Sequence, residues 1–135
     1  MAQRRMLARA IICTDQFLGL PFAAQAVYMH FILQADDDGL VSNPVTILRS
    51  INAPPGILEV LISAKYILLI DGICVITHWH IHNHIRKDRL VPSVHTTITS
   101  QLRKTKDNLY IHQSDPSACN DNQMATTCQP NDNPV

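Results

Sequence analysis

The sequence predicts a small α+β domain in which helices come first and a two-stranded ribbon follows. Apolar residues recur at helical spacing through the first half of the chain, and proline, asparagine and glycine separate these stretches. A run of β-branched and aromatic residues then surrounds Asp71-Gly72, a dipeptide typical of a tight hairpin. With 135 residues, 46% of them apolar, the chain can enclose one hydrophobic core but not two.

The first long helix is expected over residues 21–35, in the run FAAQAVYMHFILQA that follows Pro21. Good helix formers fill this run, and four apolar residues fall near one helical face. These residues are Phe22, Ala26, Met29 and Leu33. The turn ADDDG ends the helix, and only a very short strand fits at Gly39-Leu40-Val41.

Two shorter helices are predicted next. Ser42-Asn43-Pro44 supplies a capping residue and a proline at the first helical position, so a helix is expected over residues 44–51. After the break at residues 52–56, the spacing of Ile57, Val60 and Leu61 predicts a third helix that ends near Ala64.

A β-hairpin is the firmest local prediction. Residues 66–70 form the first strand, Asp71-Gly72 forms a two-residue type I′ turn, and residues 73–77 form the return strand. This element order is that of a winged helix, a three-helix core covered by a β-hairpin wing, which is an analogy at the level of the fold.

The expected organisation has three parts. Residues 1–95 form the winged-helix domain with an N-terminal arm, and residues 96–112 are a poorly defined extension without a clear period. Residues 113–135 are rich in Asn, Asp, Gln, Pro, Ser and Thr, which predicts a disordered tail.

Charge and cysteine usage restrict the class of protein. The tail carries Asp115, Asp121 and Asp132 and no Lys or Arg, so the preceding chain, with 11 basic and 8 acidic residues, is mildly basic. The cysteines, Cys13, Cys74, Cys119 and Cys128, show no CxxC spacing and indicate reduced thiols in a cytoplasmic protein. No apolar run approaches the about 18 residues of a spanning helix, so no membrane association is expected.

The stretch HWHIHNHIRKDR, residues 78–89, raises the question of a metal site. If the return strand continued through it, the two-residue period would place His78, His80, His82 and His84 on the face opposite Trp79. A His-x-His pair can share a zinc ion, but four residues on one straight strand cannot surround one ion, and no other residue is nominated as a ligand. We therefore predict no metal or other cofactor, and we expect Trp79 to be a core anchor.

The cations after the histidines suggest a surface for a polyanion. Lys and Arg contact phosphates wherever they lie within reach of a nucleic-acid backbone. The candidate residues are Arg86, Lys87 and Arg89, with Arg4 and Arg5 as an N-terminal arm. The alternative is a solvated surface on which Asp88 pairs with its neighbours. The third helix offers Glu59 and Ser63 but no Arg, Lys, Asn or Gln to meet a base edge, so base reading by that helix is not expected. No nucleophile and base are paired by their spacing in the sequence, so catalysis is not expected either.

Three separated motifs resemble one family. The segments RRMLARAIICTDQFLGLP, AQAVYMHFILQADDDGLVSNP and HWHIHNHIRKDRLVPSV are together similar to the N-terminal domain of phage replisome organisers, which are DnaD-like phage replication initiators. The resemblance covers about residues 4–95. It implies a winged-helix domain that binds double-stranded DNA at a phage origin and helps to recruit host helicase-loading proteins, without catalysis. His82 and Asn83 match the I-H-N motif and join the candidate DNA contacts.

The chain departs from that family at Pro54-Pro55-Gly56, where a capping Ser or Thr and charged residues are expected, and the second helical domain of a full-length organiser is not expected within these 135 residues. Two other functions stay open. In the first alternative, the domain is an oligomerisation or protein-interaction scaffold that forms a homo-oligomer through the ribbon or the N-terminal segment. In the second, it is a winged-helix transcriptional regulator.

Overall fold

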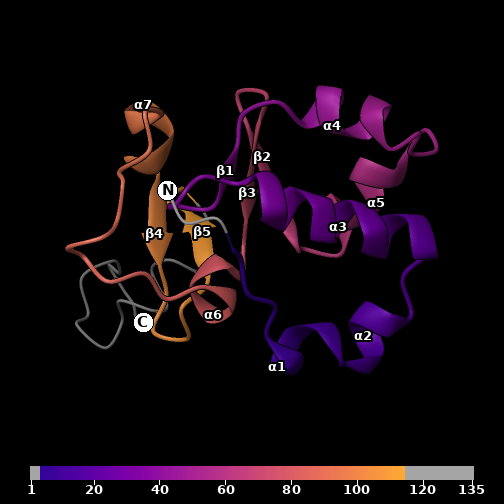
Figure 1. Ribbon diagram of the computed structural model, residues 1–135, viewed down its shortest axis with the longest axis horizontal. Helices are drawn as coiled ribbons and strands as arrows, with labels where there is room; N and C mark the ends of the chain where they lie inside the picture. Colours follow the sequence, from indigo (N-terminus) through magenta and orange to yellow (C-terminus); the bar gives the residue numbers. More distant parts are fainter. Residues whose placement is uncertain (1–3, 115–135) are drawn as a thin grey trace.

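Residues 4–114 are described by a computed structural model, which mixes short helices with two small antiparallel sheets (Figure 1). This arrangement confirms the predicted α+β class. The helices are α1 (Arg9–Ile12), α2 (Asp15–Leu18), α3 (Phe22–Gln34), α4 (Pro44–Ser50), α5 (Ile57–Ser63), α6 (Trp79–His82) and α7 (Thr96–Thr99). The strands are β1 (Leu40–Val41), β2 (Ile67–Ile70), β3 (Ile73–Ile76), β4 (Leu102–Lys104) and β5 (Tyr110–His112).

The long helix α3 confirms the helix predicted over residues 21–35, but the face that carries Phe22, Ala26, Met29 and Leu33 is not the one that packs on the core. Phe22 is 89% exposed and Leu33 is 59% exposed, and Ala26 is exposed as well. The helix is apolar on nearly every side, so the spacing of apolar residues does not select one face. The residues that face the core are Ala24, Val27, Tyr28, Phe31 and Ile32.

Helices α4 and α5 occupy the two shorter stretches predicted to be helical. Pro44 is the first residue of α4, as its fixed φ angle favours. Gly56 precedes α5 with a φ of 85°, a left-handed conformation that suits glycine. Ile57 and Leu61 of α5 are buried, and α5 packs against α3.

The predicted hairpin is confirmed with its turn. Ile70 is paired with Ile73, so Asp71 and Gly72 are the two loop residues, and their φ angles of 50° and 80° are those of a type I′ turn. The very short strand β1 pairs with β3 through Leu40 and Val75, which gives the strand order β1-β3-β2.

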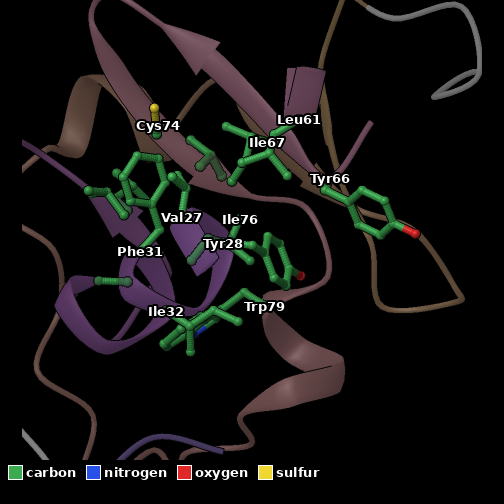
Figure 2. Packing of buried hydrophobic residues seen from close by; sticks show 14 of the residues in the cluster. Val27, Tyr28, Phe31, Ile32, Leu61, Tyr66, Ile67, Cys74, Ile76 and Trp79 are labelled. Atoms are coloured by element: carbon green, nitrogen blue, oxygen red, sulfur yellow. The ribbon is translucent and has the colours of Figure 1, made fainter. Parts of the chain in front are cut away.

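The core lies between this sheet and α3. Figure 2 shows Tyr28, Phe31 and Ile32 of α3 clustered with Ile76 and Trp79. Trp79 is fully buried, which confirms its predicted role as a core anchor.

The return strand does not continue into the histidine-rich stretch. β3 ends at Ile76, and residues 79–82 form the single helical turn α6. The expected alternation of four histidines on one face is therefore wrong, because a helical turn points successive side chains about 100° apart rather than to opposite sides. Within this turn Trp79 is buried, and His82 reaches hydrogen-bond partners in the N-terminal segment and α3.

Residues 96–112 are not a poorly defined extension. They form α7 and the hairpin β4–β5, in which Leu102 pairs with His112 and Lys104 with Tyr110. Tyr110 ties the hairpin to the rest of the fold, because its N–H donates to the Thr77 carbonyl at 2.9 Å and its hydroxyl donates to the Asp38 carbonyl at 2.9 Å. The unit that shares one core thus extends beyond residue 95. Except for residues 113 and 114, the predicted disordered tail lies outside the described residues.

Within residues 4–114, no helix is both long enough and apolar enough to cross a membrane.

Candidate nucleic-acid interface

The acidic turn, residues Asp36–Gly39, is the centre around which the candidate residues are arranged. The Asp36 carboxylate accepts hydrogen bonds from the N–H groups of Asp38 (2.9 Å) and Leu40 (3.0 Å), which closes the turn. Gly39 has a φ of +85°, and a Cβ atom there would lie 2.5 Å from Cγ of Trp79. Only glycine allows the turn to approach the indole ring this closely.

Arg5 lies inside the fold rather than on an exposed arm. Its side chain is 3% exposed, and Nη2 lies 2.9 Å from both the Asp37 carboxylate and the Ala35 carbonyl oxygen. Its guanidinium carbon stands 5.1 Å from the centroid of the Trp79 ring, within cation–π range. The proposed phosphate contact by Arg5 is therefore wrong, since its charge is already neutralised internally.

Asp37 is held on both sides. Burial would raise the pKa of its carboxyl group, but the Val91 N–H bond at 3.0 Å and the Arg5 guanidinium outweigh burial and lower the pKa. The Trp79 indole N–H donates to the Asp37 carbonyl at 3.0 Å. Asp37 thus joins the N-terminal segment, α6 and the chain after residue 90.

His82 is a structural residue in this fold. It is 2% exposed, its Nδ1 accepts the Ala8 N–H at 2.8 Å, and its Nε2 lies 2.8 Å from the Tyr28 hydroxyl. A backbone N–H can only donate, so Nδ1 carries no proton and the imidazole is neutral with its hydrogen on Nε2. Burial, with a smaller contribution from His78, lowers the pKa of His82 to about 4.

Asn83 brackets the same N-terminal segment. Its side-chain oxygen accepts the Met6 N–H at 2.8 Å, and its amide nitrogen donates to the Met6 carbonyl at 3.3 Å. Asn83 is 6% exposed. The predicted DNA contacts by His82 and Asn83 are therefore wrong, because both side chains face inward and hold residues 6–8 against α6.

The other histidines of the stretch differ in their environments. His78 and His80 are half-buried, and burial lowers the pKa of each. His80 packs against the Tyr110 ring with 4.7 Å between ring centroids, whereas His84 is exposed. Among residues 4–114, no group of three or more His, Cys, Asp and Glu side chains is placed to hold a metal ion. Cys13 and Cys74 are free thiols, and burial raises the pKa of Cys74 to about 12.

The basic segment, residues Arg86–Arg89, does face outward. The N–H groups of Arg89 and Leu90 donate to the Arg86 carbonyl at 2.9 and 3.0 Å, so the segment forms one tight turn. Ile85, just before it, packs against the core and fixes where the turn begins. Arg86, Lys87 and Arg89 are all exposed, and so is Arg4. The Arg86 pair with Asp88, at 3.1 Å, joins side chains that are 70% and 62% exposed, so solvent weakens it.

Sequence reasoning missed a second group of cations, on the β4–β5 hairpin. Arg103, Lys104 and Lys106 lie on or beside this hairpin, with Lys104 and Lys106 exposed and Arg103 half-buried. The signal was present as the run RKTK before Asp107-Asn108, a dipeptide that favours a turn, and Asn108 has a φ of 64°.

A groove of about 890 Å³ lies elsewhere, between β2 and β5. Its lining includes Ile67 and Leu69 of β2, Thr77, His78 and Ile111. Among residues 4–114, β2 pairs with β3 alone, which makes it an edge strand of its sheet, and its residues line this groove.

Comparisons with known proteins returned no match, whether against protein-family models, curated proteins or solved structures.

Proposed function

We propose that this chain is a DNA-binding domain of a phage replication initiator, a replisome organiser that binds duplex DNA at a phage origin and recruits host helicase-loading proteins. The observation that carries the proposal is the basic segment. Its cations are exposed on one tight turn, and its only ion pair among residues 4–114 is the solvated one between Arg86 and Asp88.

The arrangement of elements supports a winged-helix fold for this domain. α3, β1, α4 and α5 precede the hairpin β2–β3, and the strand order β1-β3-β2 places the hairpin beside the short strand. This order and pairing agree with a three-helix core and a β-hairpin wing, and the resemblance of residues 4–95 to replisome organisers is the basis for the replication role.

The proposed mode of binding is contact with the DNA backbone. Helix α5 corresponds in order to the base-reading helix of a helix-turn-helix protein, yet its exposed polar residues are Glu59 and Ser63. A carboxylate facing phosphates is repelled, whereas Arg86, Lys87 and Arg89 attract them and carry no sequence information. In Figure 1, α6 lies away from α4 and α5. The chain runs on from α6 into the basic segment.

Fluorescence anisotropy with a labelled duplex tests the proposal directly. If the four exposed candidate cations, Arg4, Arg86, Lys87 and Arg89, neutralise phosphates, the logarithm of the binding constant falls against the logarithm of salt concentration with a slope at least as steep as about −3.6. Absence of binding at about 50 mM salt would reject a DNA-binding function. Comparison of origin fragments with random fragments then measures whether any sequence is preferred.

The groove beside β2 favours a second candidate function, an interaction scaffold of the replication complex. An edge strand beside an apolar groove is a surface that a partner strand can occupy. Sedimentation with and without DNA separates the two functions, since a scaffold forms a dimer or larger oligomer and leaves the duplex unbound. A winged-helix transcriptional regulator differs in its preferred site, which then lies in a promoter rather than at an origin.

A further inference from the structure

The β4–β5 hairpin has the charge and exposure of a surface for a polyanion. Of the charged residues in and between its strands, three are cations, Arg103, Lys104 and Lys106, and one is an acid, Asp107. None of the three cations has a carboxylate within 4.0 Å among residues 4–114, where the ion pairs are Arg5–Asp37 and Arg86–Asp88. Lys104 and Lys106 are therefore exposed cations that form no ion pair with any other described residue.

One cation of the hairpin, Lys104, lies beside the chain that leads to the basic segment. Lys104 is paired with Tyr110 across the hairpin, which puts both side chains on the same face. Tyr110 packs on His80, and Lys104 lies close enough to His80 to lower its pKa, after the larger effect of burial. His84, two residues before Arg86, also acts on His80. Lys104 and the approach to the basic segment thus border one region.

The same acidic turn anchors both basic elements. The Asp37 and Asp38 carboxylates accept the N–H groups of Val91 (3.0 Å) and Ser93 (2.8 Å), just after the basic segment, and the Asp38 carbonyl accepts the Tyr110 hydroxyl. These carboxylates are engaged by N–H groups of the fold and, for Asp37, by Arg5. The cations of the basic segment, together with Lys104 and Lys106, are exposed, while the Asp37 and Asp38 carboxylates accept hydrogen bonds from within the fold.

We infer that the β4–β5 hairpin is a second DNA-backbone contact, in which Lys104 and Lys106 bind phosphates next to those bound by the basic segment. This inference rests on the proposed DNA-binding function and extends it to residues outside the part of the chain that resembles replisome organisers. Because phosphate contacts need only cationic groups within reach of the backbone, the hairpin adds affinity without adding sequence preference.

The test is duplex binding by the full chain carrying Lys104→Ala and Lys106→Ala together. We expect the salt slope to become shallower by about 2 and the affinity at about 100 mM salt to fall by at least about tenfold. The matched control is Arg49, an exposed cation on α4. We expect Arg49→Ala to leave the salt slope and the affinity unchanged. Replacing both lysines with arginine preserves the charge, so this variant should bind like the unsubstituted chain. Normal binding by the arginine variant, set against weak binding by the alanine variant, would show that loss of charge rather than misfolding weakens binding.

Two outcomes would overturn the inference, and they differ. If the hairpin variant binds like the unsubstituted chain while Lys87→Ala weakens binding, the second contact is absent and the proposed function stands. If the unsubstituted chain fails to bind duplex DNA at low salt, the proposed function and this inference fall together.

Discussion

At the residue scale, the hydrogen bond from Ala8 requires a neutral imidazole at His82. Its Nδ1 accepts the Ala8 N–H, so protonation replaces an acceptor with a donor facing another donor. The titratable groups that face it are Tyr28 from α3 and His78 before α6. Burial raises the pKa of the Tyr28 hydroxyl and lowers that of His78, so both are neutral near pH 7.

The first prediction concerns stability against pH. The pKa of His82 is about 4 in the folded chain and about 6.5 when unfolded, so the unfolded state binds more protons between these values. The contribution to stability is complete above pH 6.5 and falls by about 3 kcal/mol as the pH drops towards 4. Urea unfolding followed by fluorescence of Trp79, the only tryptophan, measures it.

His82→Asn is the informative variant for this prediction. The Asn side-chain oxygen can accept the Ala8 N–H but does not titrate, so the variant loses the Tyr28 contact at every pH and shows a smaller fall in stability between pH 7 and 4. Equal falls in the variant and the unsubstituted chain would contradict the role given to His82.

Gly39 gives a second prediction. Gly39→Ala introduces a Cβ atom 2.5 Å from Cγ of the buried Trp79 and forces alanine into a left-handed conformation. We expect a loss of more than about 3 kcal/mol in the free energy of unfolding. Gly72→Ala is the control, since Gly72 has a φ of +80° with no atom within 4 Å of the added Cβ, and conformational strain alone costs about 1–2 kcal/mol. Similar losses in the two variants would show that contact with Trp79 does not matter.

Residue roles were predicted unevenly from the sequence. The burial of Trp79 was foreseen from its size and position, and the exposure of Arg86 from its charge. Arg5 and His82 were misplaced because their partners are 32 and 74 residues away in the chain, in Asp37 and Ala8. A charge or an imidazole in a sequence does not reveal whether such a distant partner neutralises it.

At the scale of elements, the N-terminal segment is held by side chains rather than by a strand ladder. Asn83 bonds both polar groups of the Met6 backbone, and His82 bonds the Ala8 N–H. His82 and Asn83 thus fasten this segment to α6, and the proposed DNA contacts are the cations that follow.

The third prediction tests this fastening. Asn83→Ala leaves the Met6 N–H and carbonyl without side-chain partners, so we expect a loss of about 1–3 kcal/mol in stability and faster proteolysis within residues 4–8. Asn43→Ala is the matched control, because Asn43 is exposed and its side chain makes no capping bond to α4. Unchanged proteolysis in Asn83→Ala would mean that the segment is held by other contacts.

Elements with strong local signals were predicted, and those that depend on distant contacts were not. The hairpin β2–β3 follows from Asp71-Gly72 and its flanking β-branched residues, and α4 follows from Pro44. α6 interrupts an alternating pattern that would suit a strand, because Trp79 is buried against Gly39. β4 and β5 are three residues each, too short for a periodic pattern, and Tyr110 fixes them through Asp38 and Thr77.

At the scale of the whole molecule, charge is distributed unequally. The formal net charge is zero, yet exposed cations lie on the basic segment and on the hairpin. The chain after the basic segment and Tyr110 of the hairpin both hydrogen-bond to the acidic turn. Of the exposed acids among residues 4–114, Asp15, Glu59 and Asp71 lie on α2, α5 and the β2–β3 turn. The other two, Asp88 and Asp107, lie on the basic segment and the hairpin, where cations outnumber them. Net charge alone therefore says little about the field that a polyanion meets.

The salt dependence of duplex binding by Lys87→Ala/Arg89→Ala is the sharpest test of whether the basic segment contacts DNA, with Arg49→Ala as the control. We predict that the double variant binds all duplexes more weakly and that its salt slope is shallower by about 2. A slope equal to that of the unsubstituted chain, in a variant that unfolds at the same urea concentration, would contradict it.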